Sequence, residues 1–136
     1  MDAEYQEKLS HINDLIKLSR VDGQESHMEM NFINSVADRL GLDREDVQKI
    51  KTGSMAIDFS FPKQQHKVID QFHRLILLMG IDKIIKNEEI QFCFDLGLKM
   101  GLNPAAVLEV IKKSYRNPGY LVQKDEMDKI FKKYLN

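Results

Sequence analysis

The chain has 136 residues, of which 43% are hydrophobic and 30% charged, and its formal net charge is −1. This composition is typical of one soluble globular domain and excludes a disordered chain. A net charge close to zero provides no general attraction to nucleic acid or to an anionic membrane. Because there is a single cysteine, Cys93, an intrachain disulfide is excluded.

The sequence shows neither a targeting signal nor a membrane-spanning segment. The first residues, MDAEYQEKLSHIN, lack a basic start that leads into an apolar core, so we do not expect a secretory signal. The densest apolar run, LILLMGI at 75–81, is far too short to cross a bilayer. We therefore expect a cytoplasmic protein that does not insert into a membrane, with one domain over 1–136.

The first half of the chain predicts three helices. An apolar stripe from Tyr5 to Leu18 has helical spacing and stops at the Asp-Gly pair at 22–23. Ser26 starts a second helix, which ends at Gly41. Asp43 is a good N-cap for a short third helix that stops at the Thr-Gly pair at 52–53.

The second half predicts the same order of elements. The connector at 53–61 alternates apolar and polar residues, which indicates an ordered extended strap. Helices are expected from about Pro62 to Ile81, from Glu88 to Met100, and after the Asn-Pro pair at 103–104. A turn at 117–119 precedes a terminal helix at about 121–135.

The two halves also match each other without a gap at a shift of 60 residues, over about forty residues. The matched pairs include Leu15 with Leu75, Asp22 with Asp82, Glu29 with Glu89, Phe32 with Phe92 and Gly41 with Gly101. A repeat of this length is typically a unit that cannot bury its apolar face alone. We infer an internal duplication, with repeat one at about 10–52 and repeat two at about 62–115. The predicted fold is all-α, a compact bundle of about seven helices built from two tandem three-helix repeats.

Repeat two is more apolar than repeat one. Polar residues at 17, 19, 24 and 25 are replaced, 60 residues later, by Leu77, Met79, Ile84 and Ile85. One interpretation is that the connector and the terminal helix cover this extra apolar surface. The other is that part of it stays exposed and contacts a protein partner or a second copy in a homodimer. The predicted partner contacts are Leu77, Met79, Ile84 and Ile85.

The repeated acids have a purely structural interpretation. The Ser-x-x-Glu run from Ser26 to Glu29 is a capping box, and an Asp-Gly pair such as the one at 22–23 is a turn. In repeat two, Lys86 replaces the capping serine and has no side-chain acceptor, although Asn87 could cap in a shifted register.

The acids also permit a cation site. If the repeats are related by a pseudo-two-fold axis, Asp22, Glu29, Asp82 and Glu89 can approach one another. Carboxylate oxygens suit Ca²⁺, Mg²⁺ or Mn²⁺, and Glu25 and Glu88 would be supplementary ligands. The loop is not an EF-hand, because the twelfth position from Asp22 is Ile33 rather than glutamate. No cofactor is certain from the sequence, and both interpretations stay open.

No motif indicates catalysis. The phosphate-loop, nucleophile-elbow, Cys-x-x-Cys and His-Glu-x-x-His patterns are absent. The four histidines, at 11, 27, 66 and 73, have no mutual metal-ligand spacing, and Cys93 is typical of a small core residue. The lysines near the C-terminus are typical of a solvated helix face rather than a nucleic-acid contact. We therefore expect a non-enzymatic protein.

The segments LIKLSRVDGQESHMEMNFINSVADRLGLDREDV and LILLMGIDKIIKNEEIQFCFDLGLKMGLNPAAV resemble the TerB-like family, named for tellurite-resistance proteins. The shared features are an apolar helix that runs into Asp-Gly, an acid about seven residues on, and a Leu-Gly-Leu type of helix end. The resemblance covers about 10–114. It departs from the family at Lys83, where glycine is usual, and at Ile84 and Ile85, where polar residues are common.

The resemblance implies a compact bundle of about seven helices in two repeats. It also implies a metal bound by the acids at Asp22, Glu29, Asp82 and Glu89. Members of this family are associated with stress responses and are not established enzymes. By this resemblance we expect a protein-interaction module, with a divalent-cation-binding protein as the alternative.

Overall fold

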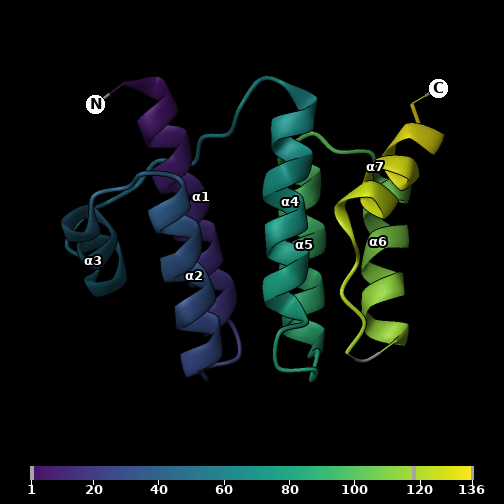
Figure 1. Cartoon of the computed structure of the whole chain (residues 1–136), viewed down its shortest axis with the longest axis horizontal. Helices are drawn as coiled ribbons and strands as arrows, with labels where there is room; N and C mark the ends of the chain where they lie inside the picture. The colour runs from purple at the N-terminus through teal and green to yellow at the C-terminus, as the bar shows by residue number, and fades with distance from the viewer. Residues whose placement is uncertain (1, 118, 136) are drawn as a thin grey trace.

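In the computed structural model, which describes residues 2–117 and 119–135, the chain forms seven helices and no strand (Figure 1). The helices are α1 (Ala3–Arg20), α2 (His27–Arg39), α3 (Arg44–Thr52), α4 (Gln65–Met79), α5 (Asn87–Lys99), α6 (Pro104–Arg116) and α7 (Lys124–Lys133). The all-α prediction is therefore confirmed. The predicted turn at 117–119 includes residue 118, which lies outside the described residues.

The helices α1 and α2, α4 and α5, and α6 and α7 form three neighbouring antiparallel pairs, with α4 and α5 in the middle, and α3 packs against α1 and α2 at one side (Figure 1). Helices α1 and α2 lie on one side of α4, α5 packs directly against it, and α6 and α7 lie on the other side. Helix α4 contacts α1, α5 and α7. This central position explains why the end of α4, Leu75–Met79, consists of apolar residues, whereas its first part includes Lys67, Asp70 and Arg74.

The best match between the two halves is that of α2 with α5, and the starts of α3 and α6 also correspond. Helices α2 and α5 are both 13 residues long, and their bounds differ by 60 residues. Each is followed by a glycine with positive φ, Gly41 at 73° and Gly101 at 81°. Gly23, in the first Asp-Gly turn, has φ 80°, and its counterpart Lys83 keeps this left-handed conformation at 66°. The conformation is costly for lysine, so the turn geometry persists although the glycine does not. The origin of the chain by duplication stays a prediction.

The centre of the core is formed where α4, α5 and α6 approach each other closely. Phe72 of α4 is completely buried, and Gly97 of α5 faces it. A methyl group at Gly97 would lie 3.1 Å from Phe72 Cε1 and 3.1 Å from Val107 Cγ1 on α6. The absence of a side chain at 97 therefore allows the three helices to meet, because closely packed interiors have little free space.

The connector and the terminal helix cover apolar surface, as one of the two interpretations of the sequence predicts. Met55, Ile57 and Phe59 of the connector pack against the core in a segment that is neither helix nor strand. Phe131 of α7 is buried and meets Phe72 edge-on, with ring centroids 6.1 Å apart. Helix α7 therefore completes the core of the second half.

The predicted helix ends differ from the observed ones by up to three residues, and the largest differences are at the starts of α4 and α7. Helix α4 begins at Gln65 rather than Pro62, and α7 covers Lys124–Lys133 rather than about 121–135. The residues before α7 are extended because they pack along α4: Val122 is completely buried, and its carbonyl accepts a hydrogen bond from His73 Nε2 at 2.7 Å.

Candidate functional site

Three connecting segments meet at one end of the molecule, the lower end in Figure 1. They are the α1–α2 loop (21–26), the α4–α5 loop (80–86) and the segment 119–123 before α7, and we call this region the loop end. Lys86 Nζ joins the first two through an ion pair with Asp22 Oδ2 at 2.9 Å. The third lies against the second, since a methyl group at Gly119 would lie 3.6 Å from Lys83 Cδ and one at Gly80 would lie 3.7 Å from Leu121 Cδ2.

Exposed apolar side chains gather at the loop end. Ten large apolar side chains are exposed among the described residues, and six of them lie in these three segments or in the adjoining helical turns. The six are Val21, Met28, Ile84, Tyr115, Tyr120 and Leu121. A surface that concentrates apolar side chains in this way is characteristic of an interaction site, whereas single scattered ones need no explanation.

The four predicted contact residues differ in their exposure to solvent. Ile84 is the most exposed large apolar side chain described, at 64%. Ile85 and Leu77 are half-buried. Met79 is completely buried, so its prediction as a contact residue is wrong. The sequence shows that the end of α4 is continuously apolar, but it does not reveal which side of this part the neighbouring helices cover.

The four repeated acids all hold local backbone in place. Asp22 Oδ1 accepts from the N–H of residue 24 at 2.9 Å, and Asp82 Oδ1 accepts from the N–H of residue 84 at 3.1 Å. Glu29 Oε1 and Glu89 Oε1 accept from the N–H of the N-cap residue of their helix, at 3.0 and 2.9 Å. The turn and capping roles predicted for these acids are therefore present in both halves.

The N-caps of α2 and α5 differ in the way the sequence indicates. Ser26 Oγ accepts from the N–H of Glu29 at 3.1 Å, which completes a capping box. Lys86 is the N-cap of α5, and because its ammonium cannot accept, only the glutamate half of the box forms. The shifted cap at Asn87 is a wrong prediction, since Asn87 is already helical. The ammonium of Lys86 reaches Asp22 instead.

The carboxylates of the two halves act on one another electrostatically. Glu29 and Glu89 are buried, with 5% and 4% of their surfaces exposed. Burial, together with the charges of Asp82 and Asp22, raises the pKa of both, and that of Glu89 reaches about 7. Lys86 has the opposite effect on Asp22, whose pKa its hydrogen bond lowers. The cluster thus contains four carboxylates and one paired ammonium.

The cluster has the donor type that a hard cation prefers but not the arrangement. Within residues 2–117 and 119–135, no three His, Cys, Asp or Glu side chains are placed to hold one metal ion. Among the supplementary ligands, Glu25 pairs with Arg20 Nε at 2.6 Å, and Glu88 is exposed. Cation binding here would require the side chains to move.

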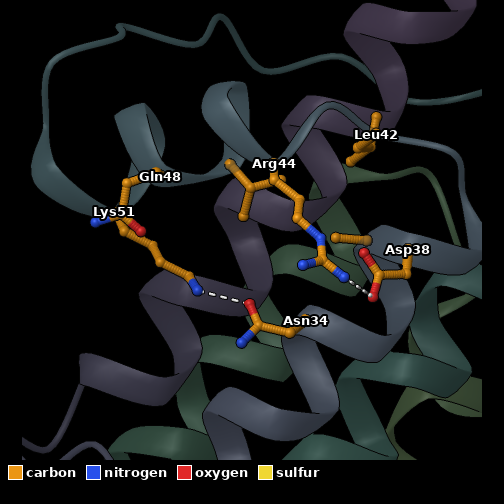
Figure 2. Close-up of a pocket in the computed structure, with 8 residues that line it drawn as sticks. Asn34, Asp38, Leu42, Arg44, Gln48 and Lys51 are labelled. Atoms are coloured by element: carbon orange, nitrogen blue, oxygen red, sulfur yellow. Dashed lines mark hydrogen bonds and ion pairs between the residues drawn. The ribbon is translucent and has the colours of Figure 1, made fainter.

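Away from the loop end, a concavity lies between α2 and α3 (Figure 2). It has a volume of about 280 Å³ and is lined by Asn34, Ala37, Asp38, Leu42, Arg44, Val47, Gln48 and Lys51. Figure 2 shows Lys51 Nζ donating to Asn34 Oδ1, at 2.6 Å, and Arg44 beside Asp38, at 3.5 Å. The polar groups pair with each other, and the lining contains neither a cysteine nor a serine, threonine or histidine that could act as nucleophile or base.

Sequence reasoning missed this cleft. Its signal was present, because its polar residues 34, 38 and 48 correspond to Phe94, Leu98 and Leu108 in the second half. There α5 and α6 pack closely around Gly97.

Sequence reasoning also missed two buried ionisable groups in α1. His11 is 1% exposed and its Nε2 atom has no hydrogen-bond partner among the described residues. Burial lowers its pKa to about 3, whereas burial raises the pKa of Asp14 to about 7. Cys93 is buried as predicted, and burial raises its pKa above the usual range. His11 and Cys93 are enclosed, so neither can reach a substrate in this conformation.

The fold and the loop end define an all-α protein with a turn-and-cap acid motif in each half. The sequence model of the family described as "Tellurite resistance protein TerB" matches residues 1–52, which comprise α1, α2 and α3. The match supports the assignment of this chain to the TerB-like family. No curated protein and no solved structure matches it. None of the described helices is both long enough and apolar enough to cross a membrane.

Proposed function

We propose that the chain is a non-enzymatic, cytoplasmic protein-interaction module whose contact surface is the loop end. The observation that carries the proposal is the gathering there of six of the ten exposed large apolar side chains. The TerB-like resemblance adds the context of a stress-linked assembly.

The apolar surface is held in a defined shape, which favours binding. The turn that presents Ile84 is fixed by the hydrogen bond from its N–H to Asp82 Oδ1 at 3.1 Å. Leu121 is positioned by the buried residue that follows it, Val122. A contact surface that is already ordered costs less conformational entropy on binding. Central apolar anchors of this kind carry most of the energy of many interfaces.

Site-specific photo-crosslinking in the native cells tests this proposal. A photoreactive amino acid replaces Ile84 in one variant and Leu135 in another. Leu135 is a matched control because it is 61% exposed and lies beyond α7, towards the opposite end of the bundle (Figure 1). We expect a discrete crosslinked species from position 84 only, and a species of twice the chain's mass would identify the partner as a second copy. Equal crosslinking from both positions, or none from position 84, would contradict the proposal.

The second candidate function is divalent-cation binding by Asp22, Glu29, Asp82 and Glu89. The supporting observation is that burial, together with the charges of Asp82 and Asp22, raises the pKa values of Glu29 and Glu89, because an added positive charge would offset the repulsion among these carboxylates. Ca²⁺, Mg²⁺ or Mn²⁺ would suit these oxygen donors. The ion would have to compete with Lys86 for Asp22.

Thermal unfolding of EDTA-treated protein separates this candidate from a purely structural role of the acids. The wild type and the Asp22→Asn, Asp82→Asn double variant are heated with and without each ion. An ion at a hundred times its dissociation constant adds about 2.7 kcal/mol, which raises the unfolding midpoint by several degrees. A rise in the wild type that is lost in the double variant would support the cation site. No rise with any ion would indicate that the four acids have only turn and capping roles.

A further inference from the structure

Taking the proposed function as its basis, we propose that the partner of the loop end is a basic amphipathic segment of another protein. Its apolar side chains would contact Ile84 and the apolar residues around it. Its lysine or arginine side chains would lie against the carboxylates of the two turns.

The first argument is the local charge. The segments 20–29 and 81–89 together carry six carboxylates, two lysines and one arginine. Glu29 and Glu89 are buried, and Glu25 pairs with Arg20. Of the two lysines, Lys86 is paired with Asp22, and the stem of Lys83 lies along Gly119. Asp82 and Glu88 are exposed and make no ion pair among the described residues, so negative charge without a cationic partner remains at this surface. Charge complementarity favours a cationic partner and repels an acidic one.

The second argument is that apolar and acidic side chains are interleaved at this surface. Asp82 is exposed and lies two residues before Ile84, and its carboxylate accepts the N–H of that residue. In the first half, Met28 is 57% exposed and follows the acids at 22 and 25. A segment that buries an apolar side chain against Ile84 thus brings its neighbouring residues to Asp82. An apolar partner without cations would leave these carboxylates facing an interface without compensation.

The third argument is the position of Lys86. Its ammonium crosses from the second half to Asp22 of the first, and 39% of the side chain remains exposed. The Asp22 side chain is 14% exposed, so a partner's cation reaches its carboxylate only where the Lys86 ammonium now lies and must displace it. Lys86 therefore acts as an internal competitor of the partner's basic side chain, and its removal should strengthen binding.

Selection from a random-peptide phage library on the intact chain tests the proposal. The probes are the selected peptides, synthesised and titrated by fluorescence anisotropy at 50 and 300 mM salt. The variants are Ile84→Ser, Asp82→Asn and Lys86→Gln, with Leu135→Ser as the matched apolar control. Each variant is first shown to unfold at a midpoint close to that of the wild type.

We expect selected peptides that combine lysine or arginine with large apolar residues. Their affinity should fall at the higher salt concentration, because screening weakens surface charge pairs. Asp82→Asn should weaken binding by about threefold and Lys86→Gln should strengthen it by a similar factor. Ile84→Ser should weaken it by about tenfold or more, and Leu135→Ser should leave it unchanged.

The outcomes separate the inference from the proposed function on which it rests. The basic partner is overturned if the selected peptides depend on Ile84 but are neutral or acidic. It is also overturned if their binding depends on neither salt nor Asp82. In both cases the contact surface itself is supported. Weaker binding after Lys86→Gln would overturn the competitor role and favour Lys86 as a direct contact. If no selected peptide depends on Ile84, both the inference and the contact surface are overturned.

Discussion

Replacing Glu89 with glutamine removes a charge from the crowded carboxylates of the loop end without removing a hydrogen-bond acceptor. The carboxylate is buried and accepts from the N–H of Lys86 at 2.9 Å, and the amide oxygen of glutamine can accept the same bond. Burial and the neighbouring acids raise the pKa of Glu89 from 4.5 to about 7. The variant therefore isolates the electrostatic cost of this charge from the capping role.

The sign of the effect follows from proton linkage. A carboxyl whose pKa is raised by folding binds its proton more tightly in the folded state, so folding is penalised only when the group must ionise. The penalty is absent below about pH 4.5, grows as the pH rises and is complete above about pH 7. Each pKa unit corresponds to 1.36 kcal/mol, which sets an upper limit of about 3 kcal/mol. Because other carboxylates relax when one is removed, we expect about 1–2 kcal/mol.

Urea unfolding of the wild type and Glu89→Gln at pH 4.5, 6 and 8 measures this difference. The variant should be more stable by about 1–2 kcal/mol at pH 8, and the gain should disappear at pH 4.5. Glu88→Gln is the matched control, because it removes the same charge from an exposed neighbouring position and should change stability little. A gain that is equal at all three pH values, or a loss at pH 8, would refute the reasoning.

Three further predictions concern the fold. Gly97→Ala should destabilise the protein by about 1 kcal/mol in chemical denaturation, because crowding of the new methyl group against Phe72 and Val107 outweighs the gain in helix propensity. Gly80→Ala is the control, and it should be nearly neutral because the methyl group would make only ordinary contacts. Lys83→Gly should stabilise the protein by about 1 kcal/mol, and Gly23→Ala should destabilise it by a similar amount, because both positions have positive φ. Two changes in stability of the same sign would contradict this. The pKa of His11 is lowered to about 3, so the stability difference between His11→Phe and the wild type should grow in favour of the variant by up to about 1.4 kcal/mol per pH unit as the pH falls from 6.5. Only this difference isolates His11, because the raised pKa values of Asp14 and Glu89 act on the wild type in the opposite direction. A difference that does not change with pH would contradict the prediction.

Features that depend on neighbouring residues along the chain could be predicted from the sequence. The capping box at Ser26 and the Asp-Gly turn at 22–23 involve groups within three residues of one another. The caps at Asp43 and Asn103 are also local, and each side chain accepts from the first turn of its helix. Local hydrogen bonds of this kind depend little on the rest of the fold, which is why the helix order follows from the sequence.

Features that depend on contacts between distant segments could not be predicted. The ion pair between Lys86 and Asp22 joins residues 64 positions apart. The burial of Met79 depends on how the neighbours of α4 pack, which its own apolar pattern does not specify. His11 is polar, yet it lies on a buried face of α1, and its Nε2 atom has no hydrogen-bond partner in the part of the chain that the structure describes. Such positions contradict the general preference for polar residues outside, so no rule of composition identifies them.

The central claim, that the loop end rather than the α2–α3 cleft contacts the partner, is tested most directly by amide chemical-shift mapping. The ¹⁵N-labelled chain is titrated with a basic amphipathic peptide from the library selection. We predict that the largest shifts fall within 21–29, 80–89 and 119–122 and that they are absent when the same peptide is added to Ile84→Ser. Shifts concentrated at 34–51, around the cleft of Figure 2, and unaffected by that substitution would contradict the account.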